Sequence, residues 1–313
     1  MPGRCGTIGD KSVRQRSDLT VHTDPIAITS ETHSLAGTLV LPDGAGNDRP
    51  VPAALIVGGP GPLPLERRAQ DGTPNWPLRW AEAFGAAGLA CLCYDQRGSG
   101  ESTGLYQDAD WDDLYGDAAA AAEILRLQPE VSRVIAVAWA DAVGFALRLA
   151  AEGKVDGLIL LAAGAHTAEE RYREQVRRLA AGRGLSDRVV ELRVRQWQAQ
   201  LQAVRDRVAA GERVAETDIG GQRIVTNLRR FLAVHEFDPM AAARQVATPA
   251  LLLHGAADTV VPPAESELLA ETLAGPVERR VYPGEGHFLY RSDQAVADAV
   301  GWMQRRAAGI TAD

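Results

Sequence analysis

The chain has 313 residues, of which 46% are hydrophobic, and its formal net charge at pH 7 is -8. An acidic balance of this size argues against a nucleic-acid-binding protein, and no stretch contains the roughly 18 consecutive apolar residues that a membrane helix needs. The length and the apolar content are sufficient for one large hydrophobic core with an inserted subdomain.

The first 18 residues are polar and contain glycine, and they lack the apolar core of a signal peptide. We therefore expect residues 1–18 to form a disordered leader and the protein to be cytoplasmic. The three cysteines, Cys5, Cys91 and Cys93, do not suggest a disulfide framework, and a metal site would lack further ligands. Nothing in the sequence implies a metal or another cofactor.

Short apolar runs predict a series of β-strands along the chain. The first two, at 26–28 and 35–41, are expected to pair antiparallel, and further strands are predicted at 53–57, 89–94, 134–138, 158–162, 250–254 and 279–282. Amphipathic helical patterns stand between them at 76–87, 111–127, 142–151, 264–273 and 292–307. The middle strands are almost wholly apolar, as is typical of strands covered on both faces. This alternation predicts an α/β fold with a mostly parallel central sheet flanked by helices.

The alternation stops between residues 164 and 243, where the sequence is helical and rich in arginine. We expect this segment to be a helical cap inserted between two parts of one core, 19–163 and 244–313. Residues 169–238 carry 14 arginines and 11 acidic residues, a net charge of +3, while the rest of the chain has a net charge of -11. A mildly basic cap would suit an anionic substrate, although charged residues on helices usually only face solvent.

One helix of the cap is marked by Ser186, a candidate N-cap, and by Gly211, a candidate stop signal. Its apolar residues recur at spacings of four and three, at Val190, Val194, Trp197, Leu201, Val204 and Val208. Such a stripe predicts packing against a neighbouring helix. The alternative is a wall that faces a ligand, which makes Trp197 a candidate substrate contact.

The segment 134–143 predicts a buried strand that turns sharply into a helix, with Ala140 at the turn. Asp258 and His287 follow later strands, in the order of a hydrolytic triad on an α/β sheet. A carboxylate on one imidazole nitrogen fixes the tautomer and raises the basicity of the other nitrogen. We therefore predict a catalytic pair of Asp258 and His287 that faces a nucleophile position without a nucleophile.

Two backbone amides are candidates for an oxyanion hole. The run Gly58-Gly59-Pro60-Gly61 ends the third apolar strand, and glycines there allow N–H groups to point into a site. Pro60 has no N–H, so Gly59 is the candidate donor, and Asp141, which follows the turn residue, is the second. Trp139 and His166 are candidate substrate contacts, although His166 is equally well explained as a surface-loop histidine.

These motifs together resemble the α/β-hydrolase superfamily over residues 20–307. The glycine-rich loop resembles the family's His-Gly-Gly-Pro-Gly oxyanion loop, with Val57 in the place of the histidine. Asp95-x-Arg97-Gly98-x-Gly100-x-Ser102 is similar to the signature that follows a core strand in the family, where an Asp–Arg pair would brace the loop. The resemblance implies an esterase-like or peptidase-like enzyme with a helical cap.

The turn departs from that family's pattern, because Ala138-Trp139-Ala140-Asp141-Ala142 stands where the family has Gly-x-Ser-x-Gly. A register shifted by one would make Asp141 the nucleophile, as in the dehalogenase branch, but would put Trp139 in a position that needs a small side chain. The loss of both glycines favours natural divergence over an engineered Ser→Ala inactivation. Both explanations remain open.

Three functions are compatible with these residues. The first is a lyase, cyclase or isomerase in which His287 acts as acid and base on a small apolar carbonyl compound, while the Gly59 and Asp141 amides stabilise an enolate or alkoxide. The second is a serine hydrolase of carboxylic esters or thioesters, inactivated by Ser→Ala. The third is a non-catalytic pseudoenzyme, which would not need the His–Asp pair. The expected partner is a small-molecule substrate, and the sequence does not indicate an oligomeric state.

Overall fold

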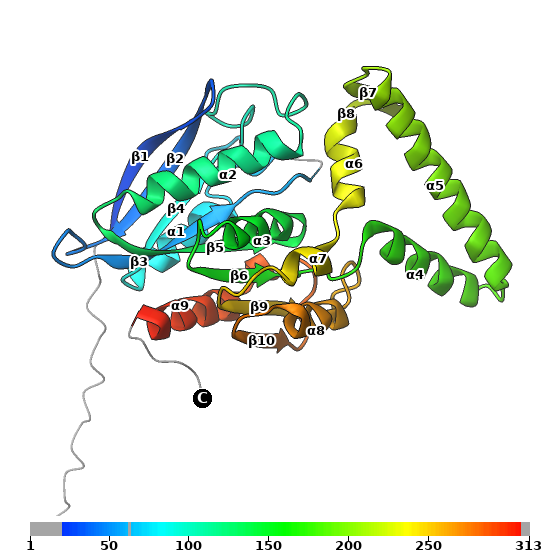
Figure 1. Ribbon diagram of the computed structural model, residues 1–313. Coiled ribbons are helices and arrows are strands. Elements are labelled where there is room, and N and C mark those ends of the chain that lie inside the picture. The colour runs from blue at the N-terminus through cyan, green and yellow to red at the C-terminus, as the bar shows by residue number, and fades with distance from the viewer. Residues whose placement is uncertain (1–20, 62–63, 308–313) are drawn as a thin grey trace, which may run out of the picture.

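The computed structural model describes residues 21–61 and 64–307, and its centre is a twisted eight-stranded sheet (Figure 1). The strands lie in the order β1-β2-β4-β3-β5-β6-β9-β10, and only the pairs β1–β2 and β2–β4 are antiparallel. Their bounds are β1 Val21–Ser30, β2 His33–Pro42, β3 Val51–Val57, β4 Ala90–Tyr94, β5 Val131–Trp139, β6 Gly157–Leu161, β9 Ala250–Gly255 and β10 Val277–Tyr282. The predicted α/β fold with a mostly parallel sheet is confirmed.

Helices cover both faces of this sheet. One face packs against α2 (Trp111–Arg126), α3 (Val143–Ala151) and α8 (Pro263–Thr272), and the other against α1 (Trp76–Ala86) and α9 (Asp293–Ala307). Side chains alternate between the two apolar layers, so that in β3 Leu55 belongs to the first and Ile56 to the second. Burial on both sides explains why the central strands read as unbroken apolar runs.

The insert after β6 is not purely helical, which corrects one expectation. It contains α4 (Ala168–Ala181), α5 (Asp187–Ala209), the hairpin β7 (Val214–Ile219) and β8 (Gln222–Asn227), then α6 (Leu228–Glu236) and the short α7 (Pro239–Ala243). Gly220 and Gly221 both have positive φ, 64° and 82°, as a two-residue hairpin turn requires. This Gly-Gly pair was the sequence signal for the missed hairpin.

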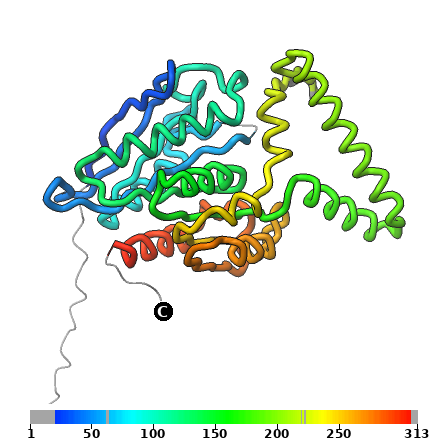
Figure 2. The backbone as a smooth tube through the Cα atoms, viewed as in Figure 1, coloured from blue at the N-terminus to red at the C-terminus, as the bar shows by residue number. Residues whose placement is uncertain are grey.

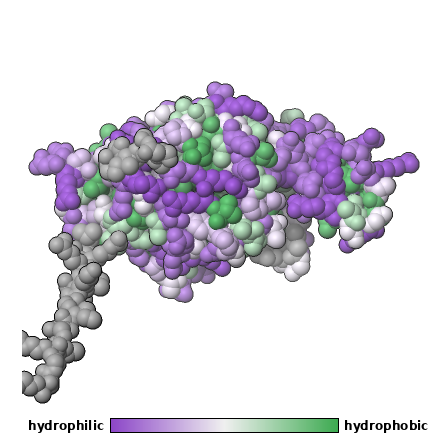
Figure 3. All heavy atoms as spheres, turned by 90° about the horizontal axis from the view of Figure 1, so that it is seen from below, coloured by the Kyte–Doolittle hydropathy of each residue, from purple (hydrophilic) through white to green (hydrophobic). Residues whose placement is uncertain are grey.

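The insert leaves the body of the molecule after β6 and returns before β9 (Figure 2). Its visible surface is mainly hydrophilic (Figure 3), and its own apolar cluster is small. Val190 and Val194 of the predicted α5 stripe are buried there against Ala180 of α4, so this part of the stripe packs on a neighbouring helix.

Arg230 and Asn227 connect the insert to the core. Arg230 Nη1 donates to the carbonyl oxygens of Tyr106 and Ala109, at 2.6 and 2.8 Å, and its guanidinium lies 4.2 Å from the Tyr106 ring centroid. Asn227 Nδ2 donates to the carbonyl oxygens of Gln107 and Asp108. These contacts fix one end of α6 over the loop that precedes α2.

The sequence also led to expectations about the cysteines, the first residues of the chain and membrane-spanning helices. Cys91 and Cys93 are buried free thiols in the same apolar layer, whereas Cys5 and the expected leader 1–18 lie outside the described residues. Within ranges 21–61 and 64–307, no helix combines the length and the apolar character needed to cross a membrane.

Candidate functional site

The backbone turns sharply at Ala140, where β5 ends. Ala140 opens the short 3-10 turn η1 (Ala140–Ala142), which continues into α3, and it has a φ of 50°. This left-handed conformation costs a residue with a side chain about 1–2 kcal/mol. Ala140 has the left-handed conformation and Asp141 does not, as expected if residue 140 occupies the nucleophile position of the turn.

Two loops at the ends of β9 and β10 bring Asp258 and His287 together. A side chain at Gly255 would meet the carbonyl oxygen of Glu285 at 2.4 Å, so only glycine allows the loops to approach this closely. The amide of Ala257 also donates to the carbonyl oxygen of Glu285, at 2.8 Å. The two predicted residues therefore meet although 29 positions separate them.

The carboxylate of Asp258 is fixed by three hydrogen bonds. Its Oδ2 lies 2.8 Å from Nδ1 of His287, and its Oδ1 accepts from the amides of Val260 and Val261 at 2.8 and 2.9 Å. The side chain of Asp258 is fully buried, and that of His287 is 11% exposed. With Nδ1 directed at a carboxylate, Nε2 of His287 is the nitrogen left for a bound molecule.

A second histidine, His254, lies behind this carboxylate and was missed in the sequence. Its Nε2 is 2.9 Å from the carbonyl oxygen of Val261 and 3.5 Å from Oδ2 of Asp258. Burial lowers the pKa of His254, although Val261 and Asp258 act in the opposite direction. The carbonyl partner requires a proton on Nε2, and Nδ1 has no hydrogen-bond partner within the described part of the chain.

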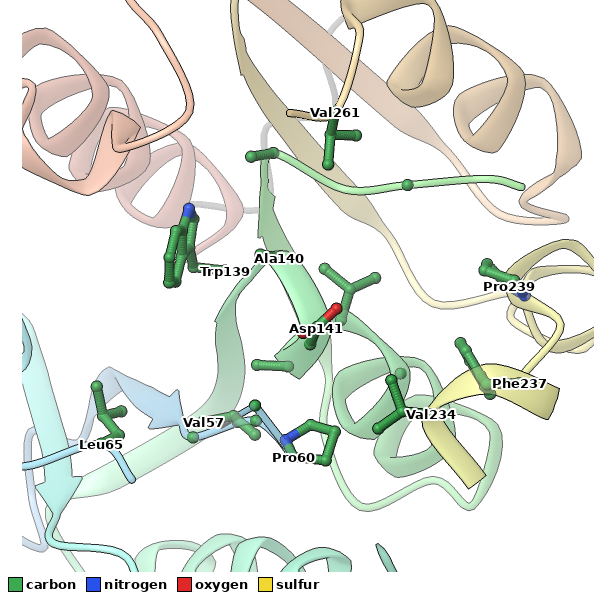
Figure 4. A pocket seen from close by; sticks show the side chains of 18 of the residues that line it. Val57, Pro60, Leu65, Trp139, Ala140, Asp141, Val234, Phe237, Pro239 and Val261 are labelled. Carbon is green, nitrogen blue, oxygen red and sulfur yellow. The ribbon is translucent and has the colours of Figure 1, made fainter. Parts of the chain in front are cut away.

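A cavity of about 530 Å³ lies over the turn, between the sheet and the insert (Figure 4). Trp139, Ala140 and His287 line it, and the carboxylate of Asp141 points into it. Most of the wall is apolar and includes Leu65, Trp76, Trp111, Val234, Phe237 and Val261. Such a cavity has the size and character of a small-molecule site.

The loop that carries Gly59 packs directly against the turn. A side chain on Gly59 would meet the amide nitrogen of Ala142 at 2.7 Å, and the carbonyl of Gly59 accepts from Gln96 Nε2 and Tyr106 Oη at 3.1 and 3.2 Å. No acceptor for its N–H is present among the residues described. The N–H of Asp141, in the first turn of a helix, likewise has no acceptor in the part of the chain that the structure describes.

The predicted Asp–Arg brace is formed by two separate ion pairs. Asp95 Oδ2 pairs with Arg67 Nη2 at 2.8 Å, and Arg97 forms a two-pronged pair with the fully buried Asp117, at 2.8 and 2.7 Å. Asp95 and Arg97 therefore hold the loop through partners that lie elsewhere in the chain.

Two candidate substrate contacts do not line the cavity as the described residues define it. His166 Nδ1 pairs with Oε1 of Glu265 at 2.7 Å, at the start of the insert. Trp197 stacks on Tyr172 inside the insert, with ring centroids 5.5 Å apart. Their role as substrate contacts therefore stays a prediction, which the lining of this cavity does not support. The missed lining residues include Trp76, Trp111, Arg171 and Phe237.

Comparisons with known proteins agree with this architecture. A family model described as serine aminopeptidase, S33, matches residues 75–294. Esterase EstD from Thermotoga maritima is 23% identical over 276 residues, which are 86% of this chain and 62% of that protein, so the chain spans less than two thirds of the relative's length.

Two solved structures show the same fold. A hypothetical protein from Pseudomonas aeruginosa has a TM-score of 0.65 and 18% identity, and the match covers 97% of this chain and 99% of that one. Est1E from Butyrivibrio proteoclasticus, solved with ferulic acid, has a TM-score of 0.62 and 14% identity, with 91% and 98% of the chains covered.

Proposed function

The chain belongs to the serine aminopeptidase S33 family of hydrolases, and we propose that it is an enzyme of unusual chemistry within that family. In this proposal His287 and Asp258 transfer protons to and from a carbonyl compound, and no acyl-enzyme forms. The observation that carries this proposal is the 2.8 Å contact between the two side chains, beside a cavity with only a methyl group at the turn. A methyl group cannot attack a carbonyl carbon, whereas the imidazole can still act as a base.

The proposed chemistry is removal of a proton from the carbon next to a carbonyl group. Nε2 of His287 takes the proton, and Asp258 stabilises the imidazolium that forms. The N–H groups of Gly59 and Asp141 stabilise the enolate oxygen, as an oxyanion hole would. Elimination, cyclisation or isomerisation can each follow from such an enolate. The apolar and aromatic wall supports a small substrate with an apolar body.

Deuterium exchange tests this proposal without knowledge of the natural substrate. Small aryl-alkyl ketones, esters and thioesters are incubated with the protein in D₂O, and the C–H groups next to the carbonyl are followed by NMR. We expect exchange that the wild type accelerates and that His287→Ala removes. Exchange that is equal in the two proteins across the panel would instead support a pseudoenzyme.

A second candidate function is hydrolysis of carboxylic esters or thioesters by a form with serine at position 140. The similarity to an esterase and the strained φ of 50° at Ala140 favour it. The test is Ala140→Ser assayed on short acyl esters, with Ala140→Ser combined with His287→Ala as the control. Our first proposal predicts no ester hydrolysis above the control. Robust hydrolysis that depends on His287 would replace the first proposal with the second.

A further inference from the structure

Arg171 is the one arginine or lysine among the described residues that line the cavity. Arg171 lies near the start of α4, and its side chain extends over Gly164. A Cβ atom on Gly164 would lie 3.1 Å from Nη1 of Arg171. The absence of a side chain at Gly164 therefore leaves the space that the guanidinium occupies.

The guanidinium of Arg171 has no ion pair or hydrogen bond in the described part of the chain. Its neighbours on α4 differ, because Arg173 pairs with Glu169 and Glu191, while Arg177 pairs with Glu174.

Arg171 is only partly buried, and the nearby carboxylate of Glu265 already accepts from the amides of Ala165 and His166 and contacts the His166 ring. The guanidinium therefore remains able to pair with a bound anion. Arginine suits this role because its planar fork binds a carboxylate with two hydrogen bonds.

Asp141 supplies the opposite charge in the same cavity. Its carboxylate points into the cavity next to Ala140 and has no partner among the described residues. It disfavours a substrate carboxylate near the turn, whereas the amides of Gly59 and Asp141 can donate directly to a carbonyl oxygen and to the enolate oxygen that forms from it. The two charges would thus orient a substrate with its anionic group at Arg171 and its carbonyl group at the turn.

We infer that Arg171 is a specificity-determining residue that binds a carboxylate of the substrate, at a distance from the reacting carbonyl. The substrate class is a small aromatic or apolar carbonyl compound that carries a free carboxylate. This inference names the substrate class of the proposed site and rests on that proposal. It places one of the insert's arginines at the cavity.

The test measures binding and not turnover, so that it is separate from the test of the chemistry. The probes are 3-phenylpropanoate and its uncharged amide, titrated against the purified full chain by calorimetry at low and high salt. We expect the wild type to bind the acid at least 10-fold more tightly than the amide, with a preference that salt weakens.

Arg171→Gln should lose the preference for the acid and leave the affinity for the amide unchanged. Arg177→Gln is the matched control on the same helix, because Arg177 is paired and does not line the cavity. Asp141→Asn should strengthen binding of the acid. Circular dichroism establishes that each variant is folded, and Arg171→Lys, which keeps the charge, should retain part of the preference if Arg171→Gln is unstable.

Equal affinity of the wild type for both probes overturns the inference, and so does an unchanged preference in Arg171→Gln or binding of neither probe. A preference that depends on Arg171, without deuterium exchange that depends on His287, would leave the carboxylate site in place and refute only the proposed chemistry. The reverse pattern would refute only the carboxylate site.

Discussion

The indole Nε1 of Trp139 donates a hydrogen bond of 3.0 Å to the carbonyl oxygen of His287, 148 positions later in the chain. Trp139 is the last residue of β5 and directly precedes Ala140. Its ring also lies 5.1 Å from the His287 ring, measured between centroids. One side chain therefore connects the turn at Ala140 to the loop that carries the histidine.

Trp139→Phe should destabilise this connection. The change removes the hydrogen bond and keeps an aromatic ring, so we expect the free energy of unfolding to fall by about 1 kcal/mol. Chemical denaturation measures it. Trp76→Phe is the matched control, because Trp76 also lines the cavity and its indole N–H has no hydrogen-bond partner among the described residues. An equal loss in both variants would count against a specific role for the Trp139 hydrogen bond.

Asp258→Asn should change the tautomer of His287. The asparagine oxygen can still accept from the amides of Val260 and Val261, which leaves its NH₂ group facing Nδ1 of His287. The proton of the imidazole then moves to Nε2, which ¹⁵N NMR of the ring detects directly. His287-dependent exchange should fall by about 10³-fold or more. An unchanged tautomer in the variant would show that Asp258 does not orient the imidazole.

Ala140→Gly should be tolerated better than Ala138→Gly, two residues earlier. Glycine relieves the left-handed strain at position 140, about 1–2 kcal/mol, against an entropic cost of about 0.5–1 kcal/mol, so stability should rise slightly or stay the same. Ala138 is fully buried in β5 without positive φ, and its loss should destabilise by about 1 kcal/mol or more. Thermal unfolding compares the two, and equal destabilisation would mean that Ala140 is not strained.

Arg230→Met should loosen the insert from the core. It leaves the carbonyl oxygens of Tyr106 and Ala109 without their donor, so the free energy that resists local opening should fall by roughly 2 kcal/mol. Hydrogen exchange of α6 and of the loop before α2 measures this opening. Arg229→Met is the control because Arg229 is exposed. If both variants exchange alike, Arg230 does not anchor the insert.

His254 should make stability depend on pH below about 6.5. Burial places its folded pKa below the ordinary value of 6.5. Above pH 6.5 both states are neutral and its contribution is fully present. As the pH falls from 6.5 toward the folded pKa, only the unfolded state gains a proton, so stability is lost, with a slope of at most about 1.4 kcal/mol per pH unit.

His254→Gln removes this titration, while the glutamine NH₂ group can still donate to the carbonyl oxygen of Val261. Unfolding free energies between pH 7.5 and 5.5 should therefore fall less steeply in the variant than in the wild type. Parallel curves for the two proteins would show that His254 does not take up its proton on unfolding.

The sequence predicted the framework because the framework depends on local periodicity. Seven of the eight strands and the helices that flank the sheet were predicted within three residues of their bounds, since burial on both faces leaves readable apolar runs in the central strands. The edge strand β1 was predicted only as 26–28 and spans Val21–Ser30, because most of its residues are exposed and leave no such run. The positions of Ala140, Asp258 and His287 after the parallel strands β5, β9 and β10 also predicted that these residues lie at one edge of the sheet, because the carboxyl ends of parallel strands meet there.

Tertiary structure decided which side chains surround the site. Trp197 and His166 are residue types that often contact substrates, but in the structure they contact Tyr172 and Glu265 and do not line the cavity. Arg171 does line it, although nothing in its local sequence distinguishes it from the other arginines of the insert. The position of His254 behind Asp258 likewise depends on the fold. Periodicity specifies which face of an element is buried, but not which element lies opposite, and a binding cavity is formed by residues from several elements.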